Sequence, residues 1–268
     1  MIALDLNPLL TLFSSIGLEE MGKVRLMNRL DTKYVVSLPV LAEILKCALP
    51  DYRIQEIKGQ RCPLYHTTYL ETQDYAMYLA HHNGKKRREK IRVRTYEVSG
   101  ISFLEVKNKT NKGRTKKERI QVEGISSLHT EDAEDFLRAY AWYDLSELRF
   151  FLENSFGRIT LVNHAMTERV TIDLNLYFHN LQTGCDSNLS RLAVIELKRN
   201  GRMESPMADI MCGLRVKPCG FSKYCIGTAL TSDFSLKNRH KAQRKAKFYI
   251  NKCRSASCMQ GGLKQASA

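Results

Sequence analysis

The 268-residue sequence has no segment that predicts secretion or membrane insertion. No run approaches 18 uncharged apolar residues, and the first ten residues include Asp5 and lack a basic start. The eight cysteines form no C-x-x-C pair, which excludes zinc-ribbon spacing, and without a signal peptide they are typical of reduced thiols. We therefore expect a cytoplasmic protein, with any membrane association made through a partner.

Acidic residues are missing from the C-terminal stretch 236–268, which carries nine of the Lys and Arg residues. This stretch accounts for +9 of the formal net charge of +14 and leaves +5 for the rest of the chain. We expect 236–268 to be a disordered basic tail that touches anionic surfaces and contributes little to chemistry. The basic segments of the body lack interleaved base-stacking motifs, which argues against nucleic acid as a substrate.

Strand patterns dominate the body of the chain. Strands are predicted over 28–38, 52–57, 64–72, 88–98, 101–109, 114–122, 158–166, 168–176, 191–199 and, at the end, 214–217. Helices are predicted over 40–49, 130–156, 205–212 and 222–230, with a helical entry over 8–26 and a polar loop over 180–189. We expect three parts: a helical entry 1–27, a strand-rich domain 28–235 and the tail 236–268.

Charged residues fall on one face of each predicted strand, because residues two apart in a strand point the same way. Arg92 and Arg94 alternate with aliphatic residues along one strand. Glu105 and Lys107 alternate with aliphatic residues along the next. An ordinary sheet with one solvated face would give a similar pattern strand by strand. Taken together, the excess of Arg and Lys favours an α+β, mainly β fold: a closed antiparallel β-barrel of about eight strands with flanking helices. Its basic interior would bind a polyanion, since guanidinium and ammonium groups match phosphate oxygens.

Eight motifs with these charges occur in a fixed order along the chain. They are DTKYV (31–35), TYLET (68–72), KIRVRTY (90–96), FLEVK (103–107), KKER (116–119), RVTID (169–173), VIELK (194–198) and GFSKY (220–224). In these motifs the chain resembles the VTC domain, the catalytic module of vacuolar transporter chaperone polyphosphate polymerases, in a stand-alone bacterial form. That family belongs to the triphosphate tunnel superfamily, together with the CYTH enzymes.

The resemblance implies a polymerase that transfers the γ-phosphoryl group of ATP onto a growing inorganic polyphosphate chain. By position, its phosphate-binding and catalytic bases fall on Lys33, Arg92, Arg94, Lys107, Lys117, Arg158, Arg169 and Lys223. Of these, Arg92, Arg94, Lys117 and Lys223 are expected to bind the nucleotide phosphates. Glu196 is the expected ligand of Mn²⁺ or Mg²⁺, and Glu105 is a second candidate by its place in the predicted tunnel.

Departures from the family patterns bear on the reaction. CYTH triphosphatases open with Glu-x-Glu-x-Lys, whereas this chain has Arg29-x-Asp31-x-Lys33, which favours polymerisation. The regulatory SPX domain and membrane helices of the eukaryotic enzymes are missing, so transport of the product would need a separate membrane protein. Hydrolysis of triphosphate and non-catalytic polyphosphate binding stay open as alternatives. The segment before Arg158 differs from the family pattern, so the assignment of Arg158 rests on its position alone. Asp173 could belong to the charged face or could simply form a hydrogen bond in a turn.

Overall fold

The computed structural model describes residues 5–22, 29–111, 114–201, 203–232, 244 and 247–252. Its helices are α1 (Asn7–Leu10), α2 (Leu18–Met21), α3 (Leu38–Ala48), α4 (Ala76–His82), α5 (Glu131–Tyr140), α6 (Pro206–Gly213) and α7 (Lys223–Thr231), with 3-10 turns η1 (Ile125–His129) and η2 (Leu145–Glu147). Its strands are β1 (Ser15–Ile16), β2 (Arg29–Ser37), β3 (Tyr52–Gln55), β4 (Leu64–Thr72), β5 (Arg88–Tyr96), β6 (Ile101–Lys109), β7 (Thr115–Val122), β8 (Leu148–Asn163), β9 (Glu168–Asn180), β10 (Asp186–Leu189) and β11 (Leu192–Asn200).

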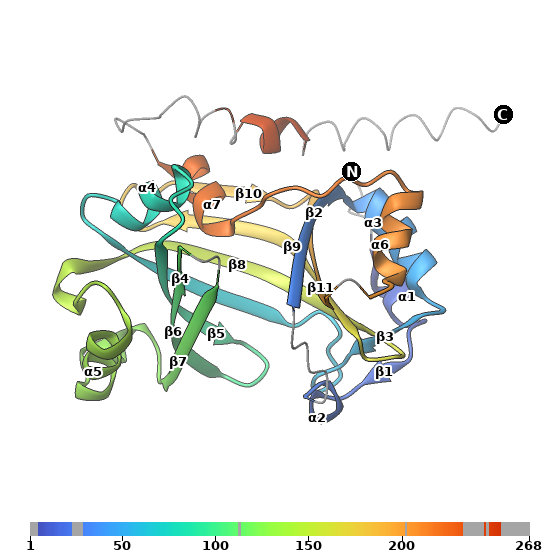
Figure 1. The fold of residues 1–268 in the computed structure, drawn as a ribbon, viewed down its shortest axis with the longest axis horizontal. Coiled ribbons are helices and arrows are strands. Elements are labelled where there is room, and N and C mark those ends of the chain that lie inside the picture. Colours follow the sequence, from blue (N-terminus) through green and yellow to red (C-terminus); the bar gives the residue numbers. More distant parts are fainter. Residues whose placement is uncertain are drawn as a thin grey trace.

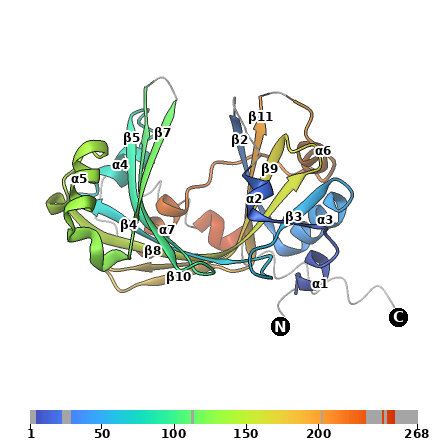
Figure 2. The ribbon, with the colours of Figure 1, turned by 90° about the horizontal axis from the view of Figure 1, so that it is seen from below.

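All strands join one sheet that bends into a trough (Figures 1 and 2). The main path is antiparallel and runs β2-β11-β9-β8-β4-β5-β6-β7, while β1, β3 and β10 attach at its margins. Among the described residues β2 and β7 end this path and do not pair with each other, so the prediction of a closed barrel is wrong. The count of about eight strands was too low for the same sheet, which has eleven strands. Face alternation predicts an inner and an outer side, but it does not determine whether the two edge strands meet.

Apolar side chains cover the outer face of the trough beneath the helices, as the alternation predicts. Helix α3 packs Leu41 and Ile44 against Ile172 of β9 and Ile195 of β11. On the other arm, the apolar residues of η1 and α5 cover those of β5 and β6 in a separate cluster. Figure 2 shows α3 and α6 outside one arm and α5 outside the other. The charged residues are therefore left on the inner face.

Four sequence predictions of secondary structure are wrong at least in part. The helix predicted over 130–156 ends at Tyr140, and Leu148–Asn163 is the long strand β8. The segment 148–152, which is apolar apart from Arg149, fits a helix or a strand equally well, and pairing with β4 and β9 decides it. The loop over 180–189 contains β10, and 214–217 has no strand. The entry 8–26 contains only the short α1, β1 and α2 in its described part.

The predicted disordered tail lies mostly outside the described residues. Within it, residues 247–252 are helical, and Tyr249 is buried against the folded domain. No described helix combines the length and the apolar character needed to cross a membrane.

Candidate functional site

Strand β5 presents three cations to the inner face of the trough. Lys90, Arg92 and Arg94 alternate with Ile91 and Val93, which are buried under α5 and η1. Arg94 is only 8% exposed, and its Nε donates to Thr67 Oγ1 at 3.3 Å. Burial, together with Arg92 and Arg158, lowers the pKa of Arg94 to about 10. Glu105 only partly offsets the charge of Arg94, so this guanidinium suits an anionic ligand.

Glu105 of β6 lies between two of these cations. It is 1% exposed, and Arg92 donates to its Oε2 from Nε at 2.7 Å, while Lys117 Nζ of β7 bonds Oε1 at 2.5 Å. Burial alone would raise the pKa of Glu105, but Arg92, Arg94 and Lys117 lower it to about 2. Glu105 is therefore ionised and links a cation of β5 to a cation of β7.

The floor of the trough carries a second ion-pair group. Arg158 of β8 binds Asp173 of β9 through two hydrogen bonds, Nε to Oδ1 at 2.6 Å and Nη2 to Oδ2 at 3.0 Å. Lys223, the first residue of α7, also donates to Asp173 Oδ2. Burial and Arg158 hold the pKa of Lys223 at about 8, although Asp173 opposes this shift. Two cations thus share one carboxylate, which leaves a net positive charge.

The opposite arm contributes Lys33 of β2 and Glu196 of β11. Lys33 Nζ lies 3.8 Å from Glu196 Oε1, and Lys198 Nζ lies 2.8 Å from Oε2. Burial opposes ionisation, but Lys198 and Lys33 lower the pKa of Glu196 to about 2. Arg169 of β9 stands opposite Lys198 in register and so points to the same face.

Charges of the two arms interact across the trough. Desolvation and Arg92 lower the pKa of Lys107 to about 8, and Lys33 and Glu196 of the other arm also act on it. The eight predicted bases therefore face one common space. We call the inner surface formed by them with two further lysines the cationic face: Lys33, Lys90, Arg92, Arg94, Lys107, Lys117, Arg158, Arg169, Lys198 and Lys223.

Three members of this site were not singled out from the sequence. Lys90 donates from Nζ to Ser222 Oγ at 3.0 Å, and burial lowers its pKa to about 7 with help from Lys33, Lys107 and Arg92. Its two-residue spacing from Arg92 was the available signal. Lys198 has the same relation to Glu196. Asp173 could be assigned only once its pairing with Arg158 was visible.

A hard divalent ion such as Mg²⁺ or Mn²⁺ needs oxygen ligands, which carboxylates of the cationic face could supply. Within the described residues no group of three His, Cys, Asp or Glu could hold a metal. Glu196, 23% exposed in its side chain, offers a carboxylate on the cationic face, and Asp31 lies on the same face because it stands opposite Lys198 in register. This fits Mg²⁺ or Mn²⁺, which commonly uses one or two carboxylates together with substrate phosphates and water. Both oxygens of Glu105 already bond cations, which favours a positioning role for Glu105 over the predicted metal ligation.

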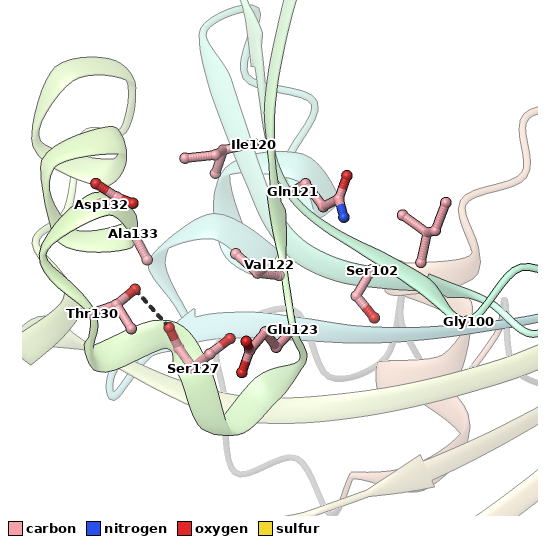
Figure 3. A pocket seen from close by; sticks show the side chains of 11 residues that line it. Gly100, Ser102, Ile120, Gln121, Val122, Glu123, Ser127, Thr130, Asp132 and Ala133 are labelled. Atoms are coloured by element: carbon pink, nitrogen blue, oxygen red, sulfur yellow. Dashed lines mark hydrogen bonds between the residues drawn. The ribbon is translucent and has the colours of Figure 1, made fainter.

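A separate hollow of about 600 Å³ lies beside the ends of β6 and β7, against η1 and α5 (Figure 3). Glu123 and Asp132 are among its lining residues, and no Lys or Arg lines it. Its charge is therefore opposite to that of the cationic face, and it is unsuited to phosphate.

The structure is similar to solved structures of other proteins, and the sequence matches the model of a known family. A conserved hypothetical protein from Pyrococcus furiosus is similar in structure at 11% identity and a TM-score of 0.37, over 70% of this chain and 91% of that chain. A putative adenylyl cyclase from Hippeastrum with a dominant triphosphatase activity is similar at 11% identity and a TM-score of 0.43, over 77% and 98%. No curated protein matches the sequence. The family model of the VTC domain matches residues 28–232, which include every member of the cationic face. The chain therefore belongs to the VTC domain family.

Proposed function

We propose that this protein is a polyphosphate polymerase that transfers the γ-phosphoryl group of ATP to the end of an inorganic polyphosphate chain. One observation carries the proposal: cations from both arms and from the floor of the trough converge on one space with too few carboxylates to neutralise them. A polyanion would offset the repulsion among these cations. Membership in the VTC domain family supports the same substrate class.

The residues of the cationic face would act by binding and orientation. Arg92, Arg94 and Arg158 present planar donors that can hold phosphate oxygens in pairs, and Lys223 adds a point charge from the start of α7. Their fixed positions would neutralise the charge that develops on the transferred group. A divalent ion held by Glu196 would supply further charge neutralisation on phosphate oxygens when bound. The attacking oxygen belongs to the acceptor phosphate, so no protein nucleophile is required.

The access to the cationic face favours a chain over a small product. Lys33 on one arm and Lys117 on the other are 37% and 39% exposed in their side chains, so the face reaches solvent on both sides. A chain bound at the floor could leave along either arm. Hydrolysis of triphosphate needs the same cations with water as the acceptor, and it is the second candidate.

The test is to incubate the purified protein with ATP and Mn²⁺ and to resolve the products on a gel. Long phosphate chains formed with stoichiometric ADP support polymerisation, whereas orthophosphate released with ADP, and no chains, supports hydrolysis. Glu196→Gln should abolish either reaction, and Glu43→Gln is a matched control because Glu43 is an exposed residue of α3 whose ion pair within the described residues is with Lys46. Absence of any product from the wild-type protein would overturn the proposed enzyme.

A further inference from the structure

The chain segment 219–223 contacts Lys33 of β2, Lys90 of β5 and Asp173 of β9. The backbone N–H of Cys219 donates to the backbone O of Lys33 at 2.8 Å, and Lys33 Nζ donates to Phe221 O at 3.1 Å. Ser222 Oγ accepts a hydrogen bond from Lys90, and Lys223 binds Asp173. The position of this segment therefore sets where two lysines of the cationic face stand.

Segment 219–223 has little regular structure of its own to fix it. Residues 216–222 lie between α6 and α7 without helix or strand. Gly220 has nothing within 4 Å of the place where a Cβ would be. Contacts from elsewhere in the chain must hold this segment in place, since irregular backbone without packing opens easily.

The C-terminal turn 247–252 supplies such contacts. Tyr249 is 5% exposed, and its ring packs edge-on against Phe221 with ring centroids 5.0 Å apart. Its hydroxyl donates to Gly220 O at 3.2 Å, and Lys252 Nζ donates to Val35 O on β2. The turn lies near α7 in Figure 1. The turn thus contacts both β2, which carries Lys33, and the segment 219–223, which is hydrogen-bonded to Lys33.

We propose that the turn 247–252 is a positioning element of the phosphate-binding site, with Tyr249 as its principal positioning residue. By holding Gly220 and Phe221, Tyr249 keeps Lys33 directed to the cationic face and keeps Ser222 and Lys223 at the start of α7. The C-terminal region then acts through this contact as well as through its charge. The inference requires that the cationic face binds phosphate, as the proposed function does, but it does not require polymerisation.

The neighbours of Tyr249 provide matched controls. Phe248 is an aromatic residue on the same turn, but it is 59% exposed. Lys247, the residue before Phe248, is an exposed cation. Phe248→Ala removes an aromatic ring that packs against Tyr249 itself, with ring centroids 5.1 Å apart, and leaves the contact of Tyr249 with Phe221 in place. Lys247→Ala removes one positive charge. Tyr249→Phe keeps the ring and removes the hydrogen bond to Gly220.

Binding of tripolyphosphate to the full-length variants is measured by calorimetry. Tyr249→Ala should weaken binding about tenfold, as expected from loss of an aromatic contact with its hydrogen bond, and Tyr249→Phe should recover most of that loss. Phe248→Ala and Lys247→Ala should bind like the wild type. Equal affinity of Tyr249→Ala and wild type, or equal weakening by Lys247→Ala, would overturn the proposal.

A second readout needs no ligand. Hydrogen exchange of the Cys219 amide, which bonds Lys33 O, should accelerate in Tyr249→Ala and stay unchanged in Phe248→Ala. Unchanged exchange in Tyr249→Ala would refute the positioning role. If exchange accelerates but the wild-type protein binds no tripolyphosphate, the turn holds segment 219–223 and the proposed phosphate site is the part that fails.

Discussion

Arg92 and Arg94 stand two residues apart on one strand and have opposite electrostatic surroundings. Arg92 forms a two-bond ion pair with the buried Glu105, whereas Arg94 faces Arg92 and Arg158 with a hydroxyl as its hydrogen-bond partner. Removing one partner of a buried pair leaves a carboxylate poorly neutralised. Removing one cation from a repelling group relieves that repulsion instead.

Replacement of each arginine by Met should separate these effects. Arg92→Met should lower the free energy of unfolding by about 2 kcal/mol, because Glu105 keeps only Lys117. Arg94→Met should leave it unchanged or raise it, and both variants should lose triphosphate binding. Urea denaturation without ligand measures the first effect. Equal destabilisation by the two substitutions would contradict the assigned pairing.

We expect Lys90 to make phosphate binding depend on pH. It faces Ser222 and the ring of Tyr224 on α7, with Lys33, Arg92 and Lys107 around it, and its pKa is lowered to about 7. A bound polyanion stabilises the ammonium form and raises this pKa, so binding near pH 8 should take up protons and weaken as the pH rises further.

Calorimetry of tripolyphosphate binding at pH 8, in two buffers of different ionisation enthalpy, counts these protons. Lys90→Met should take up about one proton fewer than the wild type, and Lys46→Met, on the exposed side of α3, should match the wild type. Equal uptake by wild type and Lys90→Met would show that Lys90 stays charged in the free protein.

Lys223 reaches Asp173 on the floor of the trough because helix α7, which begins at Lys223, packs very close to the sheet. A Cβ on Gly227 would stand 2.4 Å from Phe178 Cδ1 of β9 and 2.8 Å from Leu152 Cδ2 of β8. A side chain larger than hydrogen would therefore push α7 away from the floor of the trough.

Gly227→Ala should lower the free energy of unfolding by about 2 kcal/mol and should also weaken triphosphate binding, since Lys223 moves with α7. Gly213→Ala is the matched control, because a Cβ there meets nothing within 4 Å. Thermal melts with and without tripolyphosphate measure both effects. A Gly227→Ala protein with wild-type stability and ligand shift would contradict the close packing.

Sequence patterns predicted the strands that carry the site better than they predicted whether the sheet closes into a barrel. The two-residue alternation of charge is local, so it predicted the inward direction of Arg92, Arg94 and Glu196 correctly. Whether β2 and β7 pair depends on the bend accumulated over the whole sheet, which no local pattern records. Likewise the first part of β8, residues 148–156, was mistaken for the end of a helix, whereas 158–163 was correctly predicted as a strand. The strand character of 148–156 comes from pairing with distant segments. The contact of Tyr249 with Phe221 joins two segments that have no shared pattern in the sequence.

At the scale of the whole molecule, charge is divided between the folded domain and the C-terminal region. The stretch 236–268 was expected to contribute little to chemistry, but the turn 247–252 packs against segment 219–223. A chain ending at Leu236 should therefore lose triphosphate affinity as well as salt-sensitive adsorption to anionic vesicles. A chain ending at Lys252 should keep the affinity and lose only part of the adsorption, measured by calorimetry and vesicle sedimentation. Equal affinity of both truncated chains would contradict this division of roles.

The cationic face as the phosphate site is tested most directly by a crystal structure with tripolyphosphate and Mn²⁺. The account predicts phosphate density between Arg94 and Arg158, within reach of Lys90 and Lys223, and a metal ion beside Glu196. Phosphate bound only to the C-terminal region or in the hollow beside η1, with the cationic face unchanged, would contradict it.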